Sequence, residues 1–479
     1  MVALRVSTLD GDVVVLQPEA VEAFRNRLRG SLLLPQDDGY DDARRVWNGM
    51  TDKRPGLIVQ CAGVADVINS VNLAREHRLL VAVRGGDHSV AGHCVCDGGI
   101  MIDLSRMNSV RVDPASRTAR AEGGARWRDV DPETQAFGLA TTGGTNSDTG
   151  IGGLTLGGGL GWLAGKYGLT CDNLLSADVV TAGGTLVTAS SQENPDLFWG
   201  LRGGSGNFGI VTSFEYRLHE VGTVLAGMVI HPFERAAEVL RFYADFSRNI
   251  PDELNTVCVL LTAPDGQRLV AIAVCYNGNV DAGEIALRPL RAFGPPLVDQ
   301  IGPMPYLALQ TMLDGSFPRG RKYYWKAHLA QDIGDAAIDV IVRYFAAVPS
   351  PFSALGFQQL GNAATRVSPD ATAFSHRDAR YDFLMLSGWE DPAEAARNIE
   401  WTRKLYDEMR PLLHAGIYVN AVGEDSAQLV KAAYRPETLA RLVALKRKYD
   451  PLNLFRLNPN IAPGLYGETA SQSTVATVT

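Results

Sequence analysis

The chain has 479 residues, of which 46% are hydrophobic and 20% charged, and its formal net charge is −8. This length exceeds what one hydrophobic core supports, so we expect a globular protein of two domains. The acidic balance argues against a nucleic-acid surface and against a polybasic membrane patch. No apolar run reaches the roughly 18 residues that a membrane span requires.

The N-terminal residues lack the charged start and apolar core of a signal peptide. Six cysteines are few for this length, and most lie in apolar, strand-like runs that are typical of small buried side chains. We therefore expect a protein of the reducing cytoplasm. His88, His93, Cys94 and Cys96 lie close in sequence without a paired metal-ligand spacing, so we predict no metal site.

In chain order, residues 1–53 are interpreted as a helical lead-in. The apolar runs 57–61 and 79–84 predict strands, and residues 64–77 between them have the apolar spacing of a helix. This β-α-β unit ends on a glycine-rich turn, where open α/β sheets commonly bind ligands. Further strands are expected at 100–104, 110–114, 118–122, 174–188 (two strands around a Gly183-Gly184 turn) and 210–218, with helices starting at Trp127 and Pro195.

From residue 221 onward, the glycine loops stop and helices alternate with strands. The expected helices are 234–247, 335–347 and 400–413, and the expected strands are 257–262, 323–329 and 383–387. This pattern predicts a second α+β domain over residues 221–412. Residues 413–466 are expected to return to the first domain, and the Ser/Thr/Ala-rich residues 467–479 to be disordered.

Two glycine-rich segments carry the main functional signal. One runs from Arg84-Gly85-Gly86-Asp87-His88 to His93, and the other is Gly150-Ile-Gly-Gly-Leu-Thr-Leu-Gly-Gly-Gly-Leu-Gly161. Glycine lets the backbone approach a ligand, and successive backbone N–H groups bind an anion. His88 adds one nucleophilic imidazole that is largely neutral near pH 7. Together they predict a large, flat, phosphate-bearing cofactor held by main chain.

A third glycine motif has a different interpretation. Residues 204–209 match the dinucleotide pattern G-x-G-x-x-G, but a helix-like segment precedes them and a β-rich run follows. A dinucleotide fold requires the reverse order of strand and helix. We interpret the motif as a tight loop that leads into a strand, which makes an NAD(P)-dependent dehydrogenase the weaker hypothesis.

With these motifs, the sequence resembles the berberine-bridge-enzyme-like branch of the vanillyl-alcohol-oxidase flavoproteins, roughly over residues 40–220 and 415–465. Residues 84–88 resemble the flavin-attachment loop R-x-G-G-H, and residues 150–161 resemble the flavin-wrapping loop. The segments that start at Lys166, Asp196 and Asp450 complete the pattern. The resemblance implies an α+β fold, with a PCMH-type FAD-binding domain of two α+β subdomains. This domain is built from residues 54–220 together with the returning residues 413–466. The resemblance also implies a substrate domain with an antiparallel sheet flanked by helices.

The resemblance implies FAD bonded through its 8α-methyl carbon to the imidazole of His88. Many members have a second link from a cysteine at the position of Asn146, so attachment here is expected through one residue. Asp87 stands where the attachment loop usually has glycine. Its carboxylate could orient the His88 imidazole or raise its pKa, or the residue could strain the turn.

The residues expected at the cofactor share a position in the two loops or in segments that the resemblance places at the flavin. They are Arg84, Gly85, Gly86, Asp87, His88, Ser89, Gly92, His93, Asn146, Thr149, Gly150, Gly152, Gly153, Gly157, Gly158, Gly161, Ile210, Val211, Tyr418, Asn420 and Asn453. No chemical role is assigned to His93.

The catalytic candidates are Tyr418, Tyr324 and Gln358. Tyr418 and Asn420 resemble a Y-x-N strand that faces the flavin, where a tyrosine acts as general base if its pKa is lowered, or orients the substrate. Along the strand at 323–329, Tyr324 shares one face with Lys326, and which face lines the pocket is open. For residues 374–381, a structural turn and a substrate contact are equally favoured interpretations.

Thr149 precedes the wrapping loop, where the resemblance places the residue that gates oxygen at the flavin. The main hypothesis is an FAD-linked oxidase that takes hydride from a C–H of a small alcohol, hemiacetal, amine or ring carbon and reduces O2 to H2O2. The alternatives are an oxygenating flavoenzyme of favorskiiase type and a flavin-free binding protein on the same scaffold. The expected partners are the substrate and O2, without nucleic acid or membrane, in a monomer or homodimer.

Overall fold

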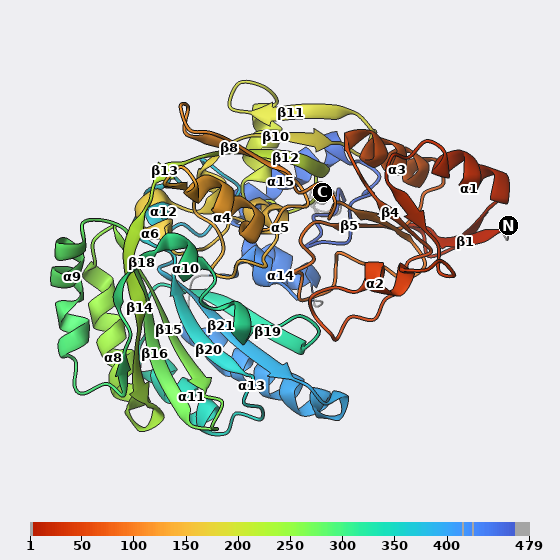
Figure 1. Cartoon of the computed structure of the whole chain (residues 1–479). Coiled ribbons are helices and arrows are strands. Elements are labelled where there is room, and N and C mark those ends of the chain that lie inside the picture. Colours follow the sequence, from red (N-terminus) through yellow and green to blue (C-terminus); the bar gives the residue numbers. More distant parts are fainter. Residues whose placement is uncertain (1–2, 414–415, 424–425, 465–479) are drawn as a thin grey trace, which may run out of the picture.

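The computed structural model of the protein describes residues 3–413, 416–423 and 426–464 (Figure 1). Two smaller sheets come from the N-terminal half of the chain, and one large antiparallel sheet comes from its middle. The tail predicted to be disordered, residues 467–479, lies outside the described residues.

The N-terminal segment is not the helical lead-in that the sequence suggested. It contains strands as well as helices, namely β1 (Leu4–Ser7), β2 (Val13–Leu16), α1 (Pro18–Arg25), β3 (Ser31–Leu33) and α2 (Tyr40–Arg44). β1 and β2 form a hairpin whose turn contains Gly11 at a φ of 86°. The Asp-Gly-Asp turn before a run of valines is the signal that identifies such a hairpin in a sequence.

The predicted β-α-β unit is confirmed and places the first glycine loop. β4 (Leu57–Gln60) and β5 (Val81–Arg84), joined by α3 (Val64–Glu76), both run parallel to β6 (Ile100–Asp103). With β3 they form a four-stranded sheet in the order β3-β4-β6-β5. Because β5 ends at Arg84, the loop that follows starts at the carboxyl edge of a parallel sheet, where ligands bind in such folds.

A second sheet of five antiparallel strands has the order β11-β10-β12-β8-β7. Its strands lie where the sequence predicted them: β7 (Val110–Asp113), β8 (Thr118–Glu122), β10 (Leu174–Val180), β11 (Leu186–Ser190) and β12 (Ile210–Arg217). The pair β9 (Leu139–Ala140) and β13 (His219–Glu220) lies beside it. The intervening helices are α4 (Trp127–Gln135), α5 (Ile151–Leu156), α6 (Ala164–Tyr167), η1 (Thr170–Asp172) and α7 (Pro195–Leu201).

The large sheet has the order β17-β14-β16-β15-β20-β21-β19, and β18 pairs with β14. Its strands are β14 (Thr223–Pro232), β15 (Leu254–Thr262), β16 (Arg268–Tyr276), β17 (Val298–Asp299), β18 (Gly302–Pro305), β19 (Lys322–Ala330), β20 (Ala354–Gln359) and β21 (Tyr381–Trp389). All its pairings are antiparallel. Because β13 ends at Glu220 and β14 starts at Thr223, we propose that the domain boundary lies at residue 221.

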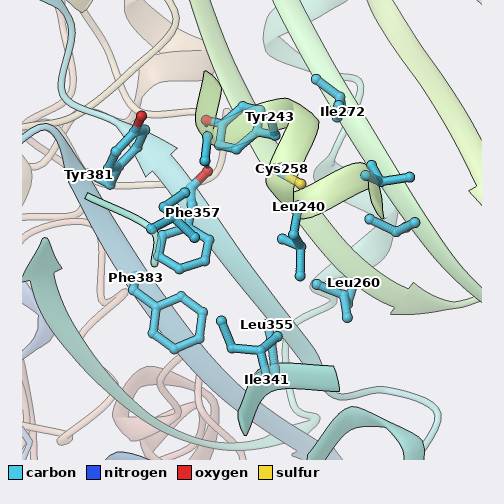
Figure 2. Close-up of a cluster of buried hydrophobic side chains, with 14 of the residues drawn as sticks. Leu240, Tyr243, Cys258, Leu260, Ile272, Ile341, Leu355, Phe357, Tyr381 and Phe383 are labelled. Atoms are coloured by element: carbon cyan, nitrogen blue, oxygen red, sulfur yellow. Dashed lines mark hydrogen bonds between the residues drawn. The ribbon is translucent and has the colours of Figure 1, made fainter. Parts of the chain in front are cut away.

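Helices cover the face of the large sheet that points away from the two smaller sheets (Figure 1). They are α8 (Ala236–Phe246), α9 (Val280–Ala292), α11 (Asp335–Ala346) and α13 (Ala395–Leu413), and the shorter helices of this region are η2 (Phe233–Arg235), η3 (Ser247–Asn249), α10 (Tyr306–Gln310), η4 (Asp314–Ser316), α12 (Asn362–Arg366) and η5 (Pro392–Glu394). Figure 2 shows part of the core between them, where Phe357 and Phe383 stack with ring centres 4.4 Å apart. This apolar layer fixes one face of the sheet, so the opposite face is free to carry a site.

The C-terminal segment contains η6 (Val419–Ala421), α14 (Ser426–Ala433) and α15 (Pro436–Tyr449). Leu439, Leu442 and Val443 pack in one cluster with Leu197 and Phe208 of the first domain. This packing supports our proposal that the segment from residue 413 returns to that domain.

One buried ion pair fixes this return. The ammonium of Lys446 donates to the Asp450 carboxylate and to the carbonyls of Asn207 and Phe455, each at 2.8 Å. Neither side chain of the pair is exposed. Burial lowers the pKa of Lys446, and Asp450 opposes that shift. The pair therefore holds α15, the residues after it and the 204–209 loop together.

Replacing Lys446 by methionine should lower the free energy of unfolding by about 3–5 kcal/mol, because Asp450 and two carbonyls remain buried without their partner. Chemical denaturation of the two proteins measures this difference. Lys448→Met is the matched control, since Lys448 is 59% exposed and pairs with Asp196 at the surface. It should cost less than about 1 kcal/mol. Equal losses in the two variants would contradict the assignment.

Candidate active site

A cavity of about 430 Å³ lies between the two smaller sheets and the uncovered face of the large sheet. Its volume is in the range of small-molecule and cofactor sites. Most of the wall comes from residues 85–94, 144–154, 205–211, the strands β19 to β21, and residues 418–422 and 455–459. Chain segments that are distant in sequence thus meet at one site.

The two glycine loops touch backbone to backbone at the floor of the cavity. A Cβ atom on Gly86 would lie 2.2 Å from the Cα of Gly150, so neither position accepts a side chain without moving the other. Gly153 and Gly206 also line the cavity, and no heavy atom among the described residues lies within 4 Å of a Cβ placed there. The floor is therefore bare main chain, as a flat cofactor requires.

The imidazole of His88 lies at this floor, with Nε2 buried and without a hydrogen-bond partner among the described residues. The ring stacks on Trp47, with centres 4.1 Å apart. Burial lowers the pKa of His88 to about 4, although Asp148 and Asp87 act in the opposite direction. The imidazole is therefore neutral at pH 7.

Asp87 acts to raise the pKa of His88, as the sequence suggested, but burial outweighs it. The hydrogen bonds of its carboxylate go to arginines and not to the His88 ring, so the expected orienting role is not supported. The Asp87 carboxylate accepts hydrogen bonds from Arg84 (2.9 Å), Arg126 (3.2 Å) and Arg319 (2.7 and 2.8 Å). Asp87 has a φ of 56°, a left-handed conformation that favours glycine. The strain suggested from the sequence is thus present, and three guanidinium groups offset it.

Tyr418 and Asn420 lie on the 3-10 turn η6, not on the predicted strand. The Tyr418 hydroxyl oxygen accepts from the backbone N–H of Gly159 (3.0 Å) and from the Asn420 amide (2.9 Å). A Cβ on Gly157 would lie 2.0 Å from the Asn420 Oδ1, so this glycine makes room for the pair. Burial raises the pKa of Tyr418, which is opposite to the shift that a general base needs.

Asp382 is a site residue that the sequence reasoning missed. It lies on β21, directly opposite Gln358 of β20, and both side chains line the cavity. Asp382 Oδ1 and Gln358 Nε2 are buried, and neither has a hydrogen-bond partner within the described part of the chain. Burial raises the pKa of Asp382 to about 7. The signal was available, because Asp382 is the one charged residue in the otherwise apolar run of β21.

The placement of Tyr324 contradicts its assignment as a catalytic candidate. Its hydroxyl oxygen accepts from Arg403 of α13 at 3.1 Å, on the helix-covered face of the large sheet. Trp325, one residue later, lines the cavity instead. The period-2 alternation along β19 was predicted correctly, and the open choice of face is thereby settled.

The cavity wall contains most of the predicted site residues, which are Gly85, Gly86, Asp87, His88, Ser89, His93, Asn146, Thr149, Gly150, Gly152, Gly153, Ile210, Val211, Gln358, Tyr418 and Asn420. The predicted residues that lie outside the wall are Arg84, Gly92, Gly157, Gly158, Gly161, Tyr324 and Asn453. Most of these support the wall from behind. Arg84 binds Asp87, and Gly161 packs against the carbonyl of Gly143.

Asn453 and residues 374–381 also lie behind the wall. Asn453 takes a left-handed turn at a φ of 53°, and Asn458 lines the cavity in its place. Within 374–381, the buried Arg377 binds Asp172 at 2.7 Å, and Phe374 packs edge-on against Tyr418. This stretch is therefore a structural turn.

The G-x-G-x-x-G segment is the loop before a strand that the sequence predicted, since α7 precedes it and β12 starts at Ile210. The sequence did not predict that Ser205, Gly206 and Gly209 of this loop line the cavity. Further missed wall residues are apolar and come from the large sheet and the segment before it: Leu313, Phe317, Trp325, Leu384 and Leu386. Such residues carry no chemical signal in a sequence, because they resemble any core residue.

These features fit a bound FAD. The floor offers bare backbone for a flat ring and for phosphate groups. The His88 side chain lines the cavity, and its Nε2 is buried and unpartnered within the described residues. Within the described ranges, no cluster of three or more His, Cys, Asp or Glu is arranged to hold a metal ion. In the same ranges, no helix combines the length and apolar character that crossing a membrane demands.

Comparison with known proteins also indicates that the chain binds FAD. A family model described as an FAD binding domain matches residues 55–190, and one described as berberine and berberine like matches residues 417–462. An FAD-linked oxidoreductase of Dictyostelium discoideum is 32% identical, with 93% of this chain and 97% of the relative covered. The (R)-6-hydroxynicotine oxidase of Paenarthrobacter nicotinovorans is 34% identical, with 91% and 97% covered.

Solved structures agree with the fold. The structure of 6-hydroxy-D-nicotine oxidase from Arthrobacter nicotinovorans matches with a TM-score of 0.84 and 32% identity, covering 91% of this chain and 98% of that one. A chitooligosaccharide oxidase matches with a TM-score of 0.83 and 26% identity, covering 92% and 99%. The expected α+β fold of PCMH type is thus confirmed.

Fold, cavity and relatives define an enzyme that is an FAD-linked oxidoreductase. Within this class, the chain belongs to the berberine-bridge-enzyme-like family.

Proposed function

We propose that this enzyme is an oxidase that removes hydride from a C–H of a small molecule, with FAD linked to His88 alone and O2 as the electron acceptor. FAD supplies the hydride acceptor, and the protein supplies binding, orientation and proton transfer. Asn146 stands where a second link would need cysteine. The neutral imidazole of His88, with its buried Nε2, supports this single attachment.

The observation that carries the proposal is the buried carboxyl of Asp382, whose Oδ1 has no hydrogen-bond partner among the described residues. As hydride leaves a C–H that bears a hydroxyl or an amine, a proton must leave the oxygen or nitrogen. Asp382 Oδ1, buried in the cavity and without a partner in the described residues, is the acceptor that the wall offers. Its pKa of about 7 suits proton transfer near neutral pH.

Gln358 and Tyr418 would orient the substrate next to Asp382. The Gln358 Nε2 has no hydrogen-bond partner within the described residues, so its N–H groups could donate to a substrate oxygen. The Tyr418 oxygen already accepts two hydrogen bonds, which leaves its O–H to donate. The apolar residues Phe317, Trp325 and Leu384 would exclude water and contact the carbon skeleton.

Relatives support a small-molecule substrate. One is named for 6-hydroxynicotine and another for chitooligosaccharides, so the candidates remain alcohols, hemiacetals, amines and ring carbons. The location in the cytoplasm and the state as monomer or homodimer stay predictions, which cell fractionation and size-exclusion chromatography measure.

Asp382→Asn should lower the rate of flavin reduction by about 100-fold or more, because the amide cannot accept the proton. In the wild type, kcat/KM should rise with pH through about 7 as Asp382 ionises. Stopped-flow reduction across pH 6–9 tests both expectations. Tyr418→Phe should slow the same step less than Asp382→Asn does. A flat pH profile, or the reverse order of the two variants, would contradict the role of Asp382.

The raised pKa of Asp382 also predicts how protein stability changes with pH, and this change can be measured without substrate. An unfolded aspartate has a pKa of about 3.9, whereas folded Asp382 has a pKa of about 7. Between these values, the folded chain binds a proton that the unfolded chain has released, so stability from this group falls as pH rises from about 4 to about 7. Asp382→Asn should therefore raise the thermal midpoint at pH 8 more than at pH 4.

Covalent attachment is tested by acid precipitation. Precipitated wild-type protein should stay yellow, with the flavin on a peptide from residues 84–93, and His88→Ala should release its flavin. His93→Ala is the matched control, because this second histidine also lines the cavity. It should keep the acid-stable flavin. Release of flavin from the wild type would refute the link.

Thr149→Leu should slow reoxidation by O2 far more than it slows reduction by substrate, because a bulkier side chain would cover the flavin edge that Thr149 leaves open. Mixing reduced enzyme with oxygenated buffer measures the rate. Thr149→Ser should behave as the wild type. If native reoxidation is already slow, the acceptor is a quinone or another protein, and the oxidase proposal fails.

Peroxide yield separates the oxidase from the oxygenating alternative. One H2O2 for each substrate oxidised supports the oxidase, whereas O2 uptake without matching peroxide favours the favorskiiase type. A purified protein without colour would favour the flavin-free binding protein.

A further inference from the structure

We propose that a segment of the second domain, residues 314–323, positions His88 for attachment to the flavin, with Arg319 as the positioning residue. We call this segment the strap. It runs from η4 to the start of β19, and the residues next to and within it, Leu313 and Phe317, line the cavity. The inference rests on the proposed covalent link and concerns what makes that link form.

The strap reaches His88 first through a stack of three rings. Trp47 stacks on His88 with ring centres 4.1 Å apart, and on Tyr323 of the strap at the same distance. Trp47 is 1% exposed. Its indole N–H donates to the carbonyl of Phe317 at 3.1 Å. The ring that supports His88 is thus itself held by the strap.

Backbone contacts fix the register of this stack. Gly320 donates to the carbonyl of Trp47 and Gly49 donates to the carbonyl of Arg321, each at 2.9 Å. The Asn48 side chain binds both the backbone N–H and the carbonyl of Tyr323, again at 2.9 Å. The strap therefore lies along residues 47–49 much as a neighbouring strand would.

The second route is an ion pair. The guanidinium of Arg319 grips the Asp87 carboxylate with two hydrogen bonds, at 2.7 and 2.8 Å, and also contacts Asp148 at 3.2 Å. The Asp87 side chain is fully buried. Such a two-point contact fixes both distance and orientation. Asp87 directly precedes His88 in the chain. The strap therefore holds two neighbouring residues of the attachment loop, Asp87 through Arg319 and His88 through Trp47.

The ion pair between Arg319 and Asp87 depends on an aspartate that the attachment loop of the family does not usually have. The attachment loop usually has glycine at this position, and glycine offers no carboxylate to Arg319. The left-handed φ of 56° at Asp87 is unfavourable for aspartate. A strained residue whose side chain binds an arginine from another domain points to a positioning role rather than to a turn requirement.

The strap would assist the formation of the bond between the His88 Nε2 and the 8α-methyl carbon of the flavin. The methyl carbon loses one hydrogen and the imidazole loses its N–H hydrogen, and O2 takes up the two protons and two electrons as H2O2. Small displacements of reacting groups cost large factors in rate, about 100-fold for about 1 Å. Attachment should therefore depend on whether the second domain is docked.

The experiment compares full-length Arg319→Met, Arg319→Lys and Lys322→Met proteins. Lys322 is the matched control, because it lies on the strap and its exposed ammonium donates to the backbone carbonyl of Glu390 at 2.7 Å and not to the attachment loop. Each protein is produced with limiting flavin and then incubated with FAD in air. Total bound flavin and acid-stable flavin are measured over time, with the thermal midpoint alongside.

We expect Arg319→Met to form the acid-stable link about 10-fold more slowly or worse, with unchanged total flavin at saturation. Arg319→Lys should be intermediate, since lysine keeps the charge but not the two-point grip. Lys322→Met should match the wild type. A rate for Arg319→Met equal to that of Lys322→Met would overturn the proposal, and so would a loss of linked and bound flavin in parallel.

Tyr323→Leu tests the ring stack without touching Arg319, and it should slow the link in the same way. Amide hydrogen exchange of residues 84–93 gives a readout that does not need the link. Faster exchange in Arg319→Met than in Lys322→Met supports the positioning role. Acid-labile flavin in the wild type would refute only the covalent link. Equal exchange in the two variants overturns the positioning role.

Discussion

The contact between Gly86 and Gly150 is the constraint on which the site depends. With their backbones this close, the attachment loop and the wrapping loop form one continuous floor, although more than sixty residues separate them. A side chain at either position would push the loops apart and remove the surface on which a flat ring can lie. The strands on either side serve this contact, because β5 presents one loop at its carboxyl end and the backbone pairing of Arg126 with Gly150 presents the other.

The sequence predicts well what local chemistry determines. The β-α-β unit before His88, the strands of the five-stranded sheet and the alternation along β19 follow from apolar periodicity, and the structure confirms them. The glycine loops identify the cofactor site because only glycine allows such close approach. The hairpin at Val13–Leu16 could also have been found, since the Asp-Gly turn before it is a known signal.

What the sequence does not reveal is set by tertiary structure. Asp382 becomes a candidate base only because β20 and β21 bury it against the cavity opposite Gln358, and its shifted pKa is a consequence of that burial. Tyr324 and Trp325 are equivalent in the sequence until α13 covers one face of the sheet. The arginines that bind Asp87 lie 3, 39 and 232 residues away in the sequence. No local pattern therefore indicates that its carboxylate binds arginines and not His88.

The return of the C-terminal segment has a consequence for how the enzyme is made. Tyr418, Asn420 and Asn458 complete the cavity wall, and Lys446 fastens the 204–209 loop from behind. During synthesis, these residues emerge from the ribosome only after every strand of the three sheets. A nascent chain that has not yet released them has no complete cofactor pocket, so flavin loading must wait for them. Until then, the half-built floor with its exposed histidine is a surface that chaperones would have to shield.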